Sequence, residues 1–139
     1  MTVSAAISKI NERCPNAADD SEQRELLERV DAYVYADIMY GREMDKATVL
    51  ALFPEHEEGT PFPSVYKPNY EEDQSKELFI PAPYDEAYIY RLEAEAYYRQ
   101  HESKKYANAM ALYNQVMFEY KNKYAREHRA LPHPPVRYW

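Results

Sequence analysis

Glycine and cysteine are both scarce in this sequence. Two glycines stand against ten prolines in 139 residues, which disfavours the glycine-lined loops that cradle nucleotides and favours rigid connecting segments. Cys14 is the only cysteine, so an intrachain disulfide and a zinc site built from several thiolates are both excluded. The chain also contains no phosphate-binding loop, nucleophile elbow or dinucleotide fingerprint.

Long hydrophobic runs are missing as well. No apolar stretch approaches the roughly 20 residues that a membrane span requires, and the start of the chain has no basic region followed by a hydrophobic one. The sequence therefore predicts a soluble protein, made in the cytoplasm, that does not associate with a membrane.

Residue patterns for catalysis or metal binding are sparse. None of the four histidines follows a glutamate at a spacing of three, as a di-iron bundle requires. The segment Glu55-His56-Glu57-Glu58 contains metal-binding residue types, but it lies in a proline-bounded loop without helical spacing to hold the ligands in place. Glu93 and Glu95 face different directions on a helix and make a poor acid–base pair. We therefore expect no catalytic residue, no metal and no cofactor.

Tyrosine is the abundant residue, with 15 copies in the chain. A tyrosine ring buries a large apolar surface while its hydroxyl still needs a hydrogen-bond partner, so this enrichment is typical of half-wet packing surfaces and protein interfaces. Composition alone therefore favours a protein that assembles with others.

The charge is unevenly placed along the chain. The net charge is −7, yet residues 55–86 carry 2 basic and 9 acidic groups, whereas residues 99–129 carry 7 basic and 3 acidic groups. An acidic face and a basic end on one small domain suit head-to-tail neighbours in a ring or stack. Ordinary solvated faces that keep the protein soluble are the alternative interpretation.

Hydrophobic periodicity predicts two helices in the first part of the chain. Thr2 or Ser4 caps a short helix with the apolar stripe Val3, Ile7 and Ile10, which Pro15-Asn16 ends. Residues 19–21 offer caps for a longer helix, and Gly41 is its expected terminator. The apolar stripe of this second helix consists of Leu26, Leu27, Val30, Tyr33, Val34 and Ile38.

Two further helices are predicted in the last part of the chain. Asp85 and Glu86 place carboxylates in the first turn of a third helix, and a break near Glu102-Ser103 opens a fourth. The inner face of the third helix consists of Tyr88, Ile89, Leu92 and Ala96. The fourth helix carries a heptad-like seam, interpreted as core or inter-subunit contact, made of Tyr106, Met110, Tyr113, Met117, Tyr120 and Tyr124.

The section between the two helical parts is rich in proline. Residues 44–83 predict an extended arm, with a short helical turn around Thr48 to Leu52 and a strand over Glu77 to Ile80. A small β-hairpin is the alternative form of this arm. Forty residues of loop are unusual inside a compact domain, so we expect the arm to contact another subunit. A corner motif, formed by Pro81, Pro83, Tyr84 and Asp85, fixes where the arm passes into the helical hairpin.

The chain finishes in a proline-rich tail, residues 129–139. Its prolines favour an extended, polyproline-like conformation, and it ends in residue types that anchor binding. We interpret it as a docking peptide, with a frayed terminus as the alternative. The candidate docking residues are Pro132, Pro134, Pro135, Val136, Arg137, Tyr138 and Trp139.

Together these features predict a mainly α protein with one domain over residues 1–128. The domain is a small helical bundle of about four helices, with the extended arm at about 44–83 and the tail beyond it. From the residues alone, the function is that of a helical interaction module.

Two groups of segments add a resemblance to a known family. The first group consists of Met1-Thr2-Val3-Ser4, Ala6-Ile7, Cys14-Pro15-Asn16, Asp19-Asp20 and Asp31-Ala32-Tyr33-Val34-Tyr35-Ala36-Asp37-Ile38. The second consists of Glu77-Leu78-Phe79-Ile80-Pro81-Ala82-Pro83-Tyr84-Asp85-Glu86-Ala87-Tyr88, followed by Tyr90, Leu92, Glu93, Ala94, Tyr97, Glu102, Tyr106, Asn108, Met110, Tyr113 and Asn114. In this order, they resemble the head–tail connector (adaptor) proteins of tailed bacteriophages and prophages of Gram-positive hosts.

The resemblance implies a structural virion protein and no enzyme. Such connectors assemble as a homo-oligomeric ring of about twelve subunits beneath the portal protein. The ring extends a channel through which DNA passes without specific binding, and it forms a platform for the next neck or tail protein. The chain would then be made in the host cytoplasm and reside in the virion neck. The tail would bind the portal; this last expectation comes from the tail residues and not from the resemblance.

Two other classes stay open. The first is a helical protein-binding regulator, unrelated to virion structure, that holds a partner helix with its tyrosine seam. The second is a metal-dependent enzyme. Nucleic-acid recognition is disfavoured, because the acidity of the whole chain opposes nonspecific affinity for DNA although the fourth helix carries several lysines and arginines.

Overall fold

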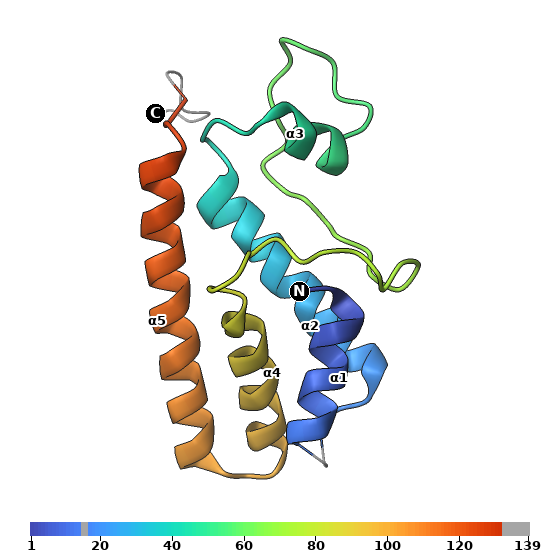
Figure 1. Cartoon of the computed structure of the whole chain (residues 1–139), viewed down its shortest axis with the longest axis vertical. Helices are drawn as coiled ribbons and strands as arrows, with labels where there is room; N and C mark the ends of the chain where they lie inside the picture. Colours follow the sequence, from blue (N-terminus) through green and yellow to red (C-terminus); the bar gives the residue numbers. More distant parts are fainter. Residues whose placement is uncertain (15–16, 132–139) are drawn as a thin grey trace.

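The computed structural model describes residues 1–14 and 17–131, and this part of the chain is mainly helical (Figure 1). The elements, in order, are α1 (Val3–Arg13), α2 (Asp20–Val34), the π-helix η1 (Tyr35–Met39), α3 (Lys46–Leu52), α4 (Glu86–Arg99) and α5 (Ser103–Glu127). The predicted small helical fold is confirmed. None of these helices is both long and apolar enough to cross a bilayer.

The two N-terminal helices begin where their capping residues predict. Thr2 Oγ1 accepts a hydrogen bond from the Ala5 amide at 3.1 Å, and Asp19 Oδ1 accepts one from the Glu22 amide at 2.9 Å. Each bond satisfies an amide that has no partner within its own helix. The stripe Val3, Ile7 and Ile10 of α1 is buried, as predicted.

Helix α2 runs directly into η1, and the helical path ends before Gly41. Gly41 has φ +85°, a left-handed conformation that side chains with a Cβ rarely adopt, so glycine is the residue suited to end the helix. The predicted stripe of α2 is buried except at Tyr33, which is 51% exposed. The prediction for Tyr33 is wrong because the side chain lies beside a groove that no other element covers.

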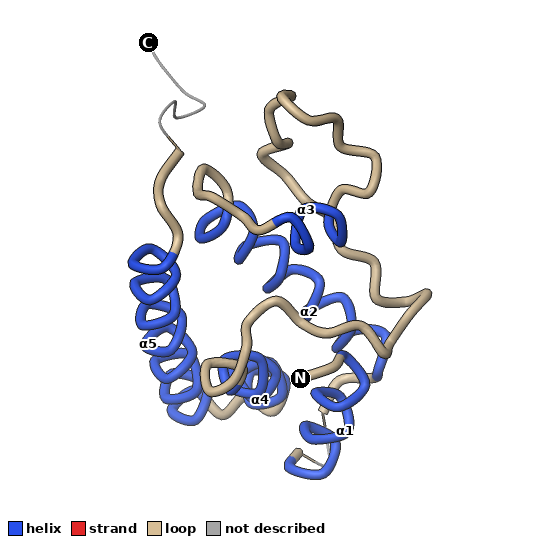
Figure 2. Tube along the Cα trace, turned by 45° about the horizontal axis from the view of Figure 1, so that its top comes forward, coloured by secondary structure: helices blue, strands red, loops and turns tan. Residues whose placement is uncertain are grey.

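Helices α4 and α5 form the predicted hairpin and make the most extensive contact between elements. The corner motif lies immediately before α4, where the Tyr84 amide donates to the Pro81 carbonyl at 2.9 Å and the Ala82–Pro83 peptide bond is cis. Figures 1 and 2 show α5 beside α4, with α1 and α2 on the other side of α4. The corner therefore sets the start of α4, and the break before Ser103 sets the start of α5.

The arm differs from its prediction in two ways. Within the described residues, Glu77–Ile80 forms no strand and no hairpin, and Glu77 makes only an isolated bridge with Thr2. The second half of the arm also packs on the chain's own helices, because the side chains of Tyr70, Leu78 and Ile80 are buried in the core. The short helix predicted around Thr48 to Leu52 is present as α3.

Candidate functional site

A carboxylate lies at the centre of the core. Asp31, on α2, is completely buried, and Gln23 is the other buried polar residue in the described part of the chain. Asp31 occupies the same helix face as Leu27 and Val34, which are buried beside it. A buried carboxylate is costly unless donors surround it, so its partners decide what it does.

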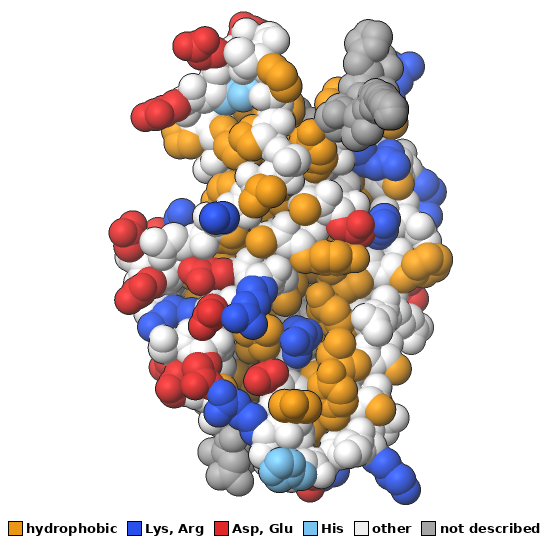
Figure 3. Space-filling model, turned by 180° about the vertical axis from the view of Figure 1, so that it is seen from behind, with side chains coloured by type: hydrophobic (Ala, Val, Ile, Leu, Met, Phe, Trp, Pro, Cys, Tyr) orange, Lys and Arg blue, Asp and Glu red, His pale blue; other side chains and the backbone are white. Residues whose placement is uncertain are grey.

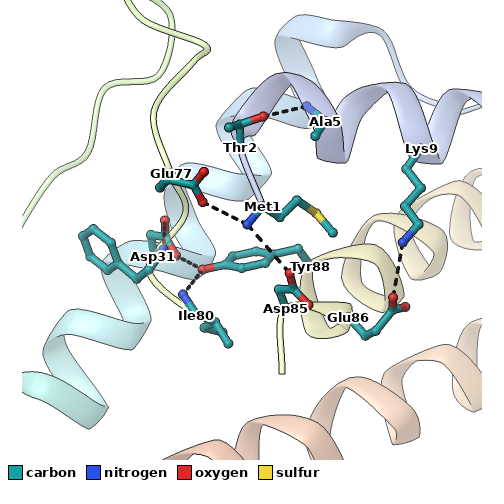
Figure 4. A network of polar contacts seen from close by, with 11 residues as sticks. Met1, Thr2, Ala5, Lys9, Asp31, Glu77, Ile80, Asp85, Glu86 and Tyr88 are labelled. Atoms are coloured by element: carbon teal, nitrogen blue, oxygen red, sulfur yellow. Dashed lines mark hydrogen bonds and ion pairs between the residues drawn. The ribbon is translucent and has the colours of Figure 1, made fainter. Parts of the chain in front are cut away.

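Three donors from distant parts of the chain converge on Asp31. The Tyr70 hydroxyl and the Phe79 amide both donate to Oδ2, the amide at 3.2 Å, and the Tyr88 hydroxyl donates to Oδ1. The Ile80 amide donates to the Tyr88 oxygen at 2.8 Å. Figure 4 shows the Tyr88 hydroxyl between Asp31 and Ile80. The network joins α2, α4 and the second half of the arm.

The Asp31 network has no cationic member among the described residues. Burial raises the pKa of Asp31 from 3.8 to about 6, although its hydrogen bonds from Tyr70, Tyr88 and the Phe79 amide act in the opposite direction. Burial and the adjacent carboxylate raise the pKa of both Tyr70 and Tyr88. The network lies away from solvent, and we assign it the structural role of fastening the arm to the bundle.

Residues 44–66, which comprise α3 and the loop after it, form a knob that stands away from the bundle at the upper right in Figure 1. Phe53 connects the knob to the body through a ring contact with Tyr35, with 5.6 Å between centroids, and it packs within the knob on Tyr66 at 5.8 Å. Tyr66 stacks in turn on Phe79 at 5.6 Å, next to the Asp31 network. Aromatic packing therefore holds the knob in place.

The surface of the knob is both acidic and apolar. Glu55, Glu57 and Glu58 are exposed and form no ion pair with any described residue. The side chains of Leu50 and Val65 are 55% and 59% exposed. The knob therefore carries both charge and apolar surface that the described chain leaves uncovered.

The candidate metal segment Glu55-His56-Glu57-Glu58 lies in this knob. The His56 ring stacks on Phe62 with 4.4 Å between centroids, and Nε2 forms hydrogen bonds with the Thr60 carbonyl and hydroxyl at 3.0 and 3.1 Å. Across the described ranges, no group of three or more histidine, cysteine, aspartate or glutamate side chains converges as a metal site would require.

A groove of about 390 Å³ separates the end of α2 and η1 from the middle of α5. Ile38 and Met117 are buried in its floor, while Tyr33 and Phe118 lie at its edges and are 51% and 66% exposed. The remaining lining residues are Asp37, Tyr113, Asn114 and Lys121. The groove thus exposes aromatic side chains beside an apolar floor.

One end of this groove is polar. Lys121 Nζ lies 2.9 Å from Asp37 Oδ2, and the Tyr33 hydroxyl donates to the same oxygen at 3.0 Å. The hydrogen bond from Lys121 lowers the pKa of Asp37.

In Figure 3, hydrophobic side chains form a stripe along the side where α5 lies, and the knob is at the upper left with acidic side chains around it.

The predicted seam of α5 divides along its length. Met117, Tyr120 and Tyr124 are buried, and the Tyr120 ring packs against Tyr84 of the corner motif at 5.7 Å. The other three members, Tyr106, Met110 and Tyr113, are half-buried. The seam is therefore chiefly the core-facing side of α5. Phe118 lies outside the predicted seam, although it is the most exposed large hydrophobic side chain in the described residues.

The other corner residues lie near the surface. Pro81 and Pro83 are exposed, and Asp85 is half-buried with its Oδ2 3.7 Å from the Met1 ammonium (Figure 4). Glu93 pairs with Arg13 at 3.0 Å, and Glu95 lies near two arginines of its own helix, so both glutamates belong to surface ion pairs.

The predicted docking residues 132–139 lie outside the described part of the chain. The residues just before them are fixed: the Leu131 amide donates to the Gly41 carbonyl at 2.9 Å, and the Glu43 amide donates to the Arg129 carbonyl at 2.8 Å. The Arg42 guanidinium donates to the Ala125 and His128 carbonyls at 3.3 and 3.0 Å. These bonds hold the end of α5 against the turn that follows η1.

Two surfaces, the knob and the groove, are therefore the candidate interaction sites, and sequence reasoning identified neither as a unit. Clustered glutamates marked the knob, but nothing in the periodicity of α5 singled out Phe118. Comparisons with protein-family models, with curated proteins and with solved structures gave no significant match.

Proposed function

We propose that this protein is a head–tail connector of a tailed phage or prophage. In this role, copies of the chain form a ring beneath the portal, extend the DNA channel and carry the next neck or tail protein. The order of residues that resemble this family supports the proposal, and so does the position of the α4–α5 hairpin directly after the corner motif.

The observation that carries the proposal is that acidic and basic side chains without ion pairs lie in different parts of this small domain. Glutamates of the knob form no ion pair among the described residues, and neither do Arg126 and Arg129 near the end of α5. Surfaces of opposite sign at different places favour contacts between copies in a closed ring.

The second half of the arm supplies further negative charge. Glu71, Glu72 and Asp73 are exposed and form no ion pair within the described residues. Repeated around a ring, these carboxylates would repel the phosphates of passing DNA and keep it from adhering to the wall. The tail would bind the portal in this assembly.

A protein-binding regulator is the second candidate function. The groove favours it, because the exposed rings of Tyr33 and Phe118 beside an apolar floor also suit a partner helix. Such a partner would use the groove, which includes the seam residues Tyr113 and Met117, because Tyr120 and Tyr124 of the seam are buried within the chain.

Electron microscopy of intact particles tests the proposal. The expected result is a ring of density for this chain between the portal and the tail, with one copy per symmetry position. Purified chain mixed with portal should also give a complex larger than the portal alone. Particles whose collar lacks the chain, together with no binding to portal, would exclude the connector and favour the regulator.

A further inference from the structure

The geometry points to a specific contact between copies: the knob of one subunit seats on the α2–α5 groove of the next. The occupant of the groove is therefore a second copy of this chain. This inference rests on the proposed ring and names the surfaces that would join its subunits.

The exposed apolar side chains match in this contact. The described residues contain six exposed large hydrophobic side chains, of which Tyr33 and Phe118 border the groove and Leu50 and Val65 lie on the knob. Placing the knob against the groove would cover four of the six at once, which removes apolar surface from water on both partners.

The charges match as well. Residues 44–66 carry four acidic groups and one lysine, and three of the acids, Glu55, Glu57 and Glu58, form no ion pair among the described residues. Lys121 lies in the groove, with half of its side chain exposed while it pairs with Asp37. Arg126 lies further along α5 and is exposed, but it does not line the groove. The acidic knob would therefore meet the lysine of the groove.

The positions of the two surfaces decide the type of assembly. The knob consists of residues 44–66, whereas the groove is lined by residues of α2, η1 and α5, so the two surfaces are different patches of the molecule. A contact between two different patches is heterologous, and it leaves a free knob at one end and a free groove at the other. Successive copies therefore add head to tail, and the chain of copies closes into a ring when the rotation between neighbours permits.

Two matched variants test this contact. Leu50→Asp places a charge on the apolar surface of the knob, and Phe118→Asp places one at the edge of the groove. Both side chains are exposed, so both variants should keep the circular dichroism spectrum of the unaltered protein. Leu112→Asp is the control, because Leu112 is 44% exposed on α5 but does not line the groove. A contact of one loop with one groove belongs to the interfaces below about 1,200 Å², which are weak, so sedimentation velocity is measured at the highest soluble concentration.

The unaltered chain and the Leu112→Asp control should show association beyond the dimer. Each knob or groove variant alone should associate about tenfold or more weakly. An equimolar mixture of Leu50→Asp and Phe118→Asp should form a heterodimer and nothing larger, because only one intact knob and one intact groove remain per pair.

An unaltered chain that stays monomeric overturns the inference, as does a variant that associates normally or a mixture that gives no heterodimer. Failure of the connector function has a different signature. In that case the variants behave as expected in solution, but particles contain no ring of this chain.

Discussion

Tyr88 and Asp31 meet in the centre of the molecule, where the phenol of α4 donates a hydrogen bond to the carboxylate of α2. The same phenol accepts a hydrogen bond from the Ile80 amide at 2.8 Å. Tyr88 therefore links the arm to Asp31 as well as linking two helices. A side chain that receives one hydrogen bond and donates another in a buried position is hard to replace.

Removal of the Asp31 carboxylate should destabilise the fold strongly. Asp31→Ala leaves two buried hydroxyls and a partly buried amide without their acceptor, so we expect the free energy of unfolding to fall by about 3–5 kcal/mol. Tyr88→Phe should cost about 1.5–3 kcal/mol, because it removes one bond to a charged group. Urea denaturation measures both. Tyr33→Phe is the control, since its hydroxyl bonds Asp37 at the surface, and a similar loss in that variant would contradict the assigned role.

Asp31 should also make stability depend on pH. Its pKa in the folded protein is about 6 against an ordinary 3.8, so the folded state binds the proton more tightly than the unfolded state. The stabilisation from protonated Asp31 is complete below pH 3.8 and is lost as the pH rises through 6. A shift of this size corresponds to about 3 kcal/mol.

Comparison with Asp31→Asn isolates this effect from other carboxylates. Asp37 has a lowered pKa, so it stabilises the fold above pH 3.8 and acts in the opposite direction. Between pH 4 and pH 7, the free energy of unfolding of the unaltered protein should fall relative to that of Asp31→Asn. Parallel pH profiles for the two proteins would show that Asp31 does not titrate in this range.

Arg42 should hold the last turn of α5. Arg42→Ala removes two hydrogen bonds to helix carbonyls and a positive charge at the negative end of the helix dipole, which should cost about 1–2 kcal/mol. Hydrogen exchange at residues 124–131 should become faster in this variant. Arg126→Ala removes an exposed charge from the same turn and should leave exchange there nearly unchanged. Equal acceleration in both variants would refute the capping role.

Phe53 should control the order of the knob. Phe53→Ala removes the ring that packs on Tyr35 and Tyr66, so limited proteolysis between residues 54 and 65 should become markedly faster. Because the ring is only half-buried, the free energy of global unfolding should fall by no more than about 1–2 kcal/mol. Leu50→Ala, which trims an exposed side chain of the same knob, should show neither effect. Unchanged proteolysis in Phe53→Ala would mean that other contacts hold the knob.

Local signals predicted the helices well. Thr2 and Asp19 are caps whose side chains act within three residues, and the break before Ser103 is also a local feature, so these boundaries can be found without tertiary information. The position of Asp31 on an apolar face, four residues after Leu27 and three before Val34, was the signal for the buried carboxylate. The sequence could not show which donors satisfy this carboxylate, because Tyr70 and Tyr88 lie far from Asp31 in the chain.

The arm could not be predicted in the same way. Its prolines prevent a regular period, so the sequence indicated an extended segment without showing which side faces the core. Tyr70, Leu78 and Ile80 turn inward because Asp31 and the apolar faces of α1, α2 and α4 offer them partners. The exposure of Phe118 was equally hidden, since it depends on how far α5 stands from η1.

The Asp31 network also specifies how the arm is aligned. The three donors lie 39, 48 and 57 positions along the chain from Asp31, so all of them reach it in only one placement of the arm. A slip by one residue would move Leu78 and Ile80 out of their buried positions and carry the Phe79 amide away from the carboxylate. A misaligned arm leaves the buried carboxylate of Asp31 without its hydrogen-bond donors, so such conformations are energetically unfavourable during folding.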